Sequence, residues 1–188
     1  DKWQIQEPVE VNCHSAERFL WALFNDPDGT HWLGTSNAGV VHFNGASWTT
    51  YNTYNSELPD PCVDSIAMNT DNSYWFGTSY GLALFDGINW TVYNTYNSGL
   101  PDSHVLAIAT DLDGSTWFGT AIGLAHLNGS NWVVYNTSNS GLPGNTVMDI
   151  DIKNDGSYWI ATDNGVGVYW ILPLYNISST PIWSDETH

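Results

Sequence analysis

A unit of about 42 residues recurs along this 188-residue chain, and this repetition limits the fold more than any other feature. Tryptophan marks two positions of the unit, and the two series are Trp32, Trp75, Trp117 and Trp159, then Trp48, Trp90 and Trp132. Leu-Pro pairs ending at Pro59, Pro101 and Pro143 keep the same period. Several independent positions with one period indicate a single supersecondary unit that is copied and stacked on itself.

Each unit has the pattern of four short β-strands. In the third unit these are "VLAIATD", "STWFGT", "IGLAHLN" and "WVVYNT", with alternating apolar residues and Asp-Gly or Asn-Gly turns between them. No segment has a helical periodicity. Four strands in about 42 residues is the size of one propeller blade. The prediction is therefore an all-β chain, a β-propeller of four blades with four antiparallel strands each.

The repeated residues have expected structural roles. A turn aspartate precedes Gly or Asn in every unit, and these aspartates are Asp28, Asp71, Asp113 and Asp155. The tryptophans Trp32, Trp75, Trp117 and Trp159 are expected to fill the wedges between neighbouring blades. A small residue follows on the same strand, which lets adjacent blades approach closely.

The sequence "VLAIATDLDGSTWFGTAIGLAHLNGSNWVVYNTSNSGLP" resembles the propeller repeats of two-component regulator sensors and of related secreted bacterial proteins. The matching pattern is V-x-x-I-x-x-D-x-D-G-x-x-W-x-G-T-x-x-G-L, and it covers nearly the whole chain. The resemblance implies a β-propeller in the periplasmic part of a sensor kinase or in an exported surface protein. It implies no shared catalytic residues.

The expected organisation is one propeller domain over residues 1–175, with units near 15–59, 60–101, 102–143 and 144–175. Residues 1–7 match an outer strand, and residues 176–188 form a C-terminal arm. Two arrangements remain open. In one, residues 1–7 complete the last blade and close a four-bladed ring. In the other, the last blade completes itself with "LPLYN" and the N-terminal strand is left over, as an edge that can pair with a second chain or belong to a larger propeller.

The charge and cysteine content limit the partners. The net charge of −17, with only three Lys and Arg, argues against nucleic acids and anionic membranes. No apolar run reaches membrane-spanning length. We expect a secreted, extracellular or cell-surface protein, with a periplasmic location as the alternative. In such an oxidising compartment, a disulfide between Cys13 and Cys62 is expected.

The sequence contains no recognisable catalytic or metal-binding motif. His42 and His126 share one repeat position with Leu84 and Val168, which favours packing over ligation. We expect no metal and no cofactor, with structural calcium at the Asp-x-Asp-Gly turns left as an alternative. No cluster of Asp, Glu or His interrupts the repeat in the sequence. The chain is therefore expected not to be an enzyme.

Repeated aromatic residues on the outer strands and the loops after them are the candidate binding residues: Tyr51, Tyr54, Tyr93, Tyr96 and Tyr135. Two functions remain. The first is a structural, self-associating surface protein, a fibre or sheath subunit that forms a homo-oligomer or polymer by exchanging terminal strands. The alternative is a module that recognises a glycan or protein, or the sensor propeller of a larger receptor.

Overall fold

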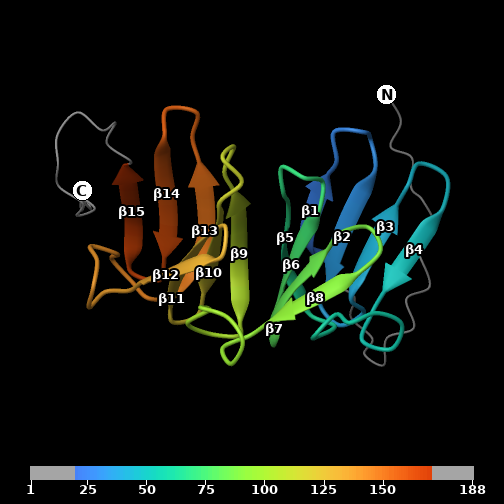
Figure 1. Ribbon diagram of the computed structural model, residues 1–188, viewed down its shortest axis with the longest axis horizontal. Coiled ribbons are helices and arrows are strands. Elements are labelled where there is room, and N and C mark those ends of the chain that lie inside the picture. The colour runs from blue at the N-terminus through green and yellow to red at the C-terminus, as the bar shows by residue number, and fades with distance from the viewer. Residues whose placement is uncertain (1–19, 171–188) are drawn as a thin grey trace.

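The computed structural model describes residues 20–170, which form fifteen strands in four antiparallel sheets and contain no helix (Figure 1). The predicted all-β propeller architecture is confirmed. The predicted outer strand at residues 1–7, the arm at residues 176–188 and Cys13 lie outside the described residues. Within the described part, no helix is long and apolar enough to cross a membrane.

Each sheet is a meander whose strands pair in chain order. The first sheet contains β1 (Leu20–Asn25), β2 (His31–Thr35), β3 (Val40–Phe43) and β4 (Trp48–Tyr51). The second contains β5 (Val63–Met68), β6 (Tyr74–Thr78), β7 (Gly81–Phe85) and β8 (Trp90–Tyr93). The third contains β9 (Val105–Thr110), β10 (Thr116–Thr120), β11 (Gly123–Asn128) and β12 (Asn131–Tyr135). The fourth contains β13 (Val147–Ile152), β14 (Ser157–Thr162) and β15 (Gly165–Trp170).

The turn between the first two strands of each sheet has the same construction. The residue after the turn aspartate has a positive φ in all four sheets, and these residues are Gly29, Asn72, Gly114 and Gly156. Each aspartate accepts a hydrogen bond from the backbone N–H two residues further on. These hydrogen bonds, from the backbone and from the Thr or Ser side chain, hold the aspartate pKa values below their usual range.

Neighbouring sheets pack face to face, and the three interfaces repeat one pattern. One side of each interface, here called the forward face, carries the buried Trp32, Trp75 or Trp117. The opposite side, here called the rear face, belongs to the next sheet and carries a buried Val and a large apolar residue, such as Val63 with Phe76. Each core cluster therefore lies between two blades, so no blade has a separate core of its own.

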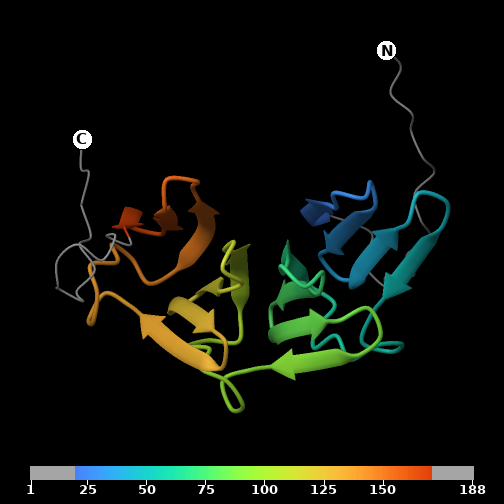
Figure 2. The same ribbon diagram turned by 45° about the horizontal axis from the view of Figure 1, so that its top comes forward.

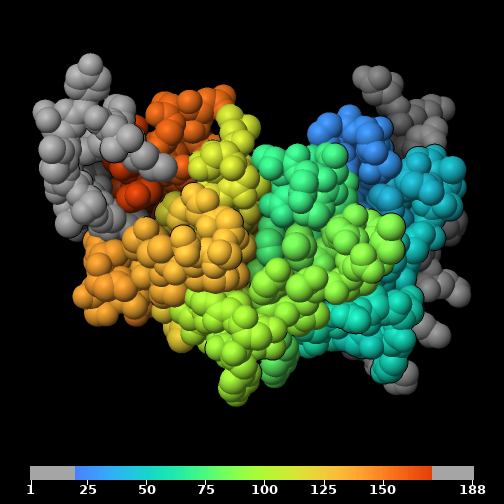
Figure 3. All heavy atoms as spheres, in the orientation of Figure 1, coloured from blue at the N-terminus to red at the C-terminus, as the bar shows by residue number. Residues whose placement is uncertain are grey.

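The sheets form an arc with β1, β5, β9 and β13 on its concave side (Figure 2). These inner strands contact one another in sequence along the arc. In the space-filling view, the atoms of successive units lie in continuous contact (Figure 3). Among residues 20–170, the first and fourth sheets do not pack extensively against each other, so the described part forms an open arc instead of a closed ring.

The open arc changes the environment of one predicted wedge residue. Trp32, Trp75 and Trp117 are at most 3% exposed, whereas Trp159 is 40% exposed. The expectation that all four tryptophans fill wedges therefore holds for three of them in the described structure. The reason is that the first three sheets each have a following sheet, and no described residue forms a sheet after the fourth.

Candidate functional site

The first strand of every sheet carries a β-bulge near its start. The register shifts at this point place Trp21, Asp64, Leu106 and Met148 outside the regular pairing. A bulge redirects the side chain of the extra residue and is common beside functional sites. Since the four inner strands are neighbours and each has its bulge near its start, the bulges lie along one edge of the arc that passes all four sheets. We call this edge the bulge end.

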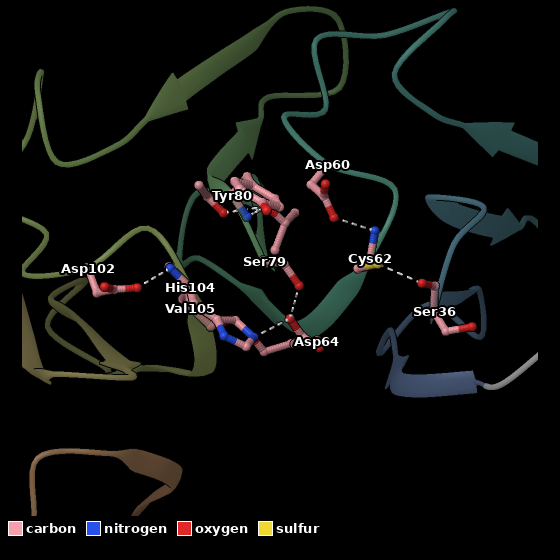
Figure 4. Close-up of polar contacts among 12 residues, drawn as sticks. Ser36, Asp60, Cys62, Asp64, Ser79, Tyr80, Asp102, His104 and Val105 are labelled. Atoms are coloured by element: carbon pink, nitrogen blue, oxygen red, sulfur yellow. Dashed lines mark hydrogen bonds and ion pairs between the residues drawn. The ribbon is translucent and has the colours of Figure 1, made fainter.

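Asp64 is the only charged residue among the four bulge positions, and it is held in a small polar cluster (Figure 4). Its Oδ2 atom lies 3.2 Å from His104 Nε2 and 3.4 Å from the Ser79 hydroxyl. The Asp64 side chain is 10% exposed, whereas His104 is 40% exposed. Burial raises the pKa of Asp64, and the neighbouring His104 and Ser79 oppose that rise.

The His104 contact is one version of a contact made at every internal interface. The residue just before each inner strand reaches back to the preceding sheet. Cys62 donates its Sγ–H to the carbonyl of Ser36, and Thr146 donates its hydroxyl to the carbonyl of Ala121 over 3.1 Å. His104 contacts a carboxylate instead. The second-to-third interface therefore holds an Asp–His pair where the other two hold neutral hydrogen bonds.

Exposed apolar side chains are found at other bulges and at the turns after β6 and β10, on the same edge of the sheets. Trp21 and Met148 are 52% and 53% exposed at their bulges. Tyr80 and Ile122, at the turns after β6 and β10, are 72% and 53% exposed. Large exposed apolar residues with a few polar groups are typical of ligand-binding surfaces.

The geometry does not form a nucleophile–base pair. Ser79 donates to Asp64, and His104 also contacts Asp64, so His104 is not placed as a base for the Ser79 hydroxyl. The Cys62 thiol is half-buried, and burial together with the carboxylates of Asp60 and Asp64 raises its pKa to about 11. A thiol with a raised pKa is a poor nucleophile. The cluster therefore offers polar groups that are engaged with one carboxylate and not with each other.

The five predicted binding tyrosines fall into two groups. Tyr51, Tyr93 and Tyr135 are half-buried, with ring centroids 6.0, 5.4 and 5.7 Å from those of Trp32, Trp75 and Trp117. These three tyrosines extend the cores between the blades. Tyr54 and Tyr96 are each 97% exposed in the loops after β4 and β8. The structure therefore does not gather the five into one site.

The two repeated histidines pack against tryptophans. His42 stacks on Trp32 with ring centroids 4.1 Å apart, and His126 stacks on Trp117 at 4.0 Å. Burial lowers the pKa of both histidines, although nearby carboxylates oppose the shift. In residues 20–170, no three His, Cys, Asp or Glu side chains are grouped to hold a metal ion. The Cys13–Cys62 disulfide stays a prediction because Cys13 is outside the described residues.

Sequence reasoning missed the Asp64–His104 pair, although a signal was present. Asp64 aligns in the repeat with Leu106 and Met148, and His104 aligns with Cys62 and Thr146. Asp64 is therefore a polar departure from an apolar repeat position, and His104 is a titratable type of side chain where the other units have Cys or Thr. The two residues are 40 positions apart, so only the packing of the second sheet on the third reveals that they meet.

Solved structures with the same fold include an extracellular domain, an enzyme and a bacterial surface component. The extracellular domain of a protein described as a hybrid two-component system of B. thetaiotaomicron is 19% identical, with a TM-score of 0.72 over 95% of this chain. Streptogramin B lyase is 17% identical, with a TM-score of 0.65 over 81% of this chain. PorZ, a surface component of the type-IX secretion system of Porphyromonas gingivalis, is 17% identical, with a TM-score of 0.63 over 77%.

These matches establish the fold class: the chain is a run of β-propeller blades, and its resemblance to sensor propeller repeats is confirmed at the level of the fold. The chain spans 28%, 51% and 25% of those three structures, respectively. No family model matches the chain, and no curated protein matches its sequence.

Proposed function

We propose that this chain is a ligand-recognition module, located outside the cell or in the periplasm, that binds its ligand at the bulge end of the arc. The observation that carries the proposal is the Asp64–His104 pair, which interrupts the repeat among exposed Trp21, Tyr80 and Ile122. Repeat positions that serve only packing would keep similar residues. A few polar groups beside exposed apolar side chains are what specific recognition requires.

The similar extracellular sensor domain supports this role and this location, since it has the same fold over nearly the whole chain. It favours recognition over the fibre or sheath subunit expected from the terminal strands. The lyase shares the fold but is an enzyme, so the fold alone does not decide between binding and catalysis. The arrangement around Asp64 favours binding, because Ser79 and His104 both contact the carboxylate and not each other.

The ligand class that fits this surface combines a flat apolar face with hydrogen-bonding groups. Trp21 and Tyr80 offer aromatic surface, and Asp64 with His104 offers a carboxylate acceptor and a ring nitrogen. Oligosaccharides and peptides with aromatic residues both meet this description. The net charge of −17 disfavours strongly anionic ligands.

The test is a thermal-shift screen of neutral oligosaccharides and short peptides, followed by calorimetric titration of each hit. The double variant Asp64→Leu with His104→Thr copies the residues of the neighbouring units, Leu106 and Thr146, and should weaken binding at least tenfold. The matched control, Tyr54→Ser with Tyr96→Ser, copies Ser138 of the third unit and should leave binding unchanged.

Three results would count against the proposal. If the double variant at Asp64 and His104 binds as tightly as the natural chain, the bulge end is not the site. If the tyrosine control loses binding instead, the ligand contacts the loops after β4 and β8. A screen without any hit would favour a structural role for the arc.

A further inference from the structure

Each internal interface of the arc uses the same hydrogen bond between its two sheets. A residue at the start of the second strand donates a hydroxyl to an acceptor in the first turn of the preceding sheet. Tyr74 donates to Asp26, Thr116 to Asn69 over 3.2 Å, and Tyr158 to Asp111. The bond accompanies the apolar packing of a forward face on a rear face. Together they define what a blade needs in order to dock.

The rear face of the first sheet has the apolar pattern of an occupied rear face, and several of its side chains are exposed although Val41 is only 4% exposed. Leu20 and Leu23 are 65% and 64% exposed, and Trp48 is 38% exposed. Val63, the repeat equivalent of Leu20, is fully buried in the second sheet. Exposed apolar side chains in a docking pattern indicate a missing partner surface, since soluble proteins seldom leave such a face open.

The forward face of the fourth sheet keeps Trp159 and Val166, which are 40% and 49% exposed, but it differs from the other forward faces in its polar residues. Asp149 and Asp151 pair with Ala161 and Trp159, where the third sheet has Ala107 and Ala109. Lys153 stands at the position of the acceptors Asp26, Asn69 and Asp111. A polar outer face of this kind is typical of the terminal repeat of a stack.

The fourth sheet also differs from the first three sheets at the small residue of the second strand. An added Cβ at Gly34, Gly77 or Gly119 would meet the carbonyl oxygen of the next sheet's first valine at 2.6, 2.7 or 2.9 Å. The fourth sheet has Ala161 at this position, so its own Cβ occupies the space that the next blade would need. The fourth sheet cannot accept a blade at the spacing of the three internal interfaces.

We propose that the rear face of the first sheet docks one further blade of this repeat type, and that the occupant presents a buried Trp, a Gly on its second strand and an Asp or Asn acceptor. His31 holds the position of the donors Tyr74, Thr116 and Tyr158 in the first sheet. Its ring lies 3.0 Å from Asn25 in the open arc, and an acceptor on the docked blade would offer it a partner across the interface.

A second copy of this chain is not the occupant. Head-to-tail closure of two arcs would place Lys153 of one copy opposite His31 of the other, where the internal interfaces have the acceptors Asp26, Asn69 and Asp111. It would also bring Ala161 against the carbonyl oxygen of Leu20. The structures with the same fold extend well beyond the region that this chain matches, which agrees with a docking face for more blades.

The experiment supplies the missing blade within the full chain. A copy of residues 105–146 is inserted directly before Leu20. Thr146 precedes Val147, the repeat equivalent of Leu20, so the junction keeps the repeat register. We expect the melting temperature to rise by at least about 5 °C. We also expect amide exchange in β1 and β2 to slow at least tenfold, because the rear face becomes covered.

The control insert carries Asp111→Lys and Gly119→Ala in the copied repeat, which reproduces Lys153 and Ala161. It should lose both effects. A second variant, Leu23→Glu, should leave the melting temperature of the natural chain unchanged and cancel the rise in the chain with the insert.

Three results would overturn the proposal. The first is equal stabilisation by the insert and its control. The second is an insert that stays unstructured while β1 and β2 exchange as before. The third is a natural chain that sediments as a dimer and whose dimer Lys153→Asp does not strengthen. Such a dimer would show that the rear face of the first sheet and the forward face of the fourth already fit each other without an acceptor at position 153. None of these results depends on ligand binding at the bulge end.

Discussion

Gly34 shows how one small residue determines the spacing between blades. A Cβ at this position would lie 2.6 Å from the carbonyl oxygen of Val63, which belongs to the backbone of the next sheet and cannot turn away. Gly34→Ala should therefore cost about 1–3 kcal/mol, the usual penalty for overpacking. Urea unfolding measures this loss. The reverse change, Ala161→Gly, should have little effect, because no described sheet follows the fourth one; equal costs at both positions would contradict the packing argument.

The stacked histidines predict how stability depends on pH. Burial lowers the pKa of His42 and His126 in the folded chain. Below the unfolded value of about 6.5, the unfolded chain therefore binds more protons than the folded chain, so stability falls as pH decreases through that value toward the folded pKa values. The double variant His42→Leu with His126→Val copies Leu84 and Val168.

Melting curves between pH 7.5 and pH 5 test this prediction. The double variant should lose at most half as many degrees as the natural chain over that interval. The opposite change, Leu84→His, places a histidine beside Trp75 and should increase the loss. Parallel curves for all three proteins would show that the histidine stacks do not control the pH dependence.

At the scale of strands and sheets, the hydroxyl contacts between blades carry a definite prediction. Tyr158 of the fourth sheet donates to Asp111 of the third, and burial together with this carboxylate raises the pKa of Tyr158. Tyr158→Phe removes the donor and leaves Asp111 without this partner, which should cost about 1–3 kcal/mol. Urea unfolding of Tyr54→Phe supplies the control, since Tyr54 is 97% exposed and should tolerate the change. A cost that is the same for both variants would exclude a role for the contact.

The strands themselves could be predicted from the sequence because the residues within each strand and turn determine them. Alternating apolar residues and the positive φ at Gly29 and Asn72 follow from side-chain type and position within each 42-residue unit. The Asp64–His104 pair could not be predicted in this way. It depends on a bulge that redirects Asp64 and on the distance between two neighbouring sheets, and neither is encoded in one unit. The exposure of Trp159 likewise depends on which sheet follows, not on the residues around it.

For the molecule as a whole, the open arc predicts an uneven distribution of stability. The second and third sheets are packed on both faces, whereas the first and fourth are each packed on one face among the described residues. In a stack of repeats, stability is close to a sum of nearest-neighbour interfaces, so the end units open most easily.

Native-state hydrogen exchange measures this distribution strand by strand. Amides of β6 and β10, in the middle of the second and third sheets, should exchange at least tenfold more slowly than those of β2 and β14, which hold the same places in the end sheets. Ligand binding at Asp64 and His104 should slow exchange mainly in β5 and β9, because those inner strands begin beside the pair. In a ring whose ends are joined, every sheet has two neighbours and the four sheets would be equally protected. Equal protection of β2, β6, β10 and β14 would therefore show that the first and fourth sheets are covered in solution, and it would contradict the open arc.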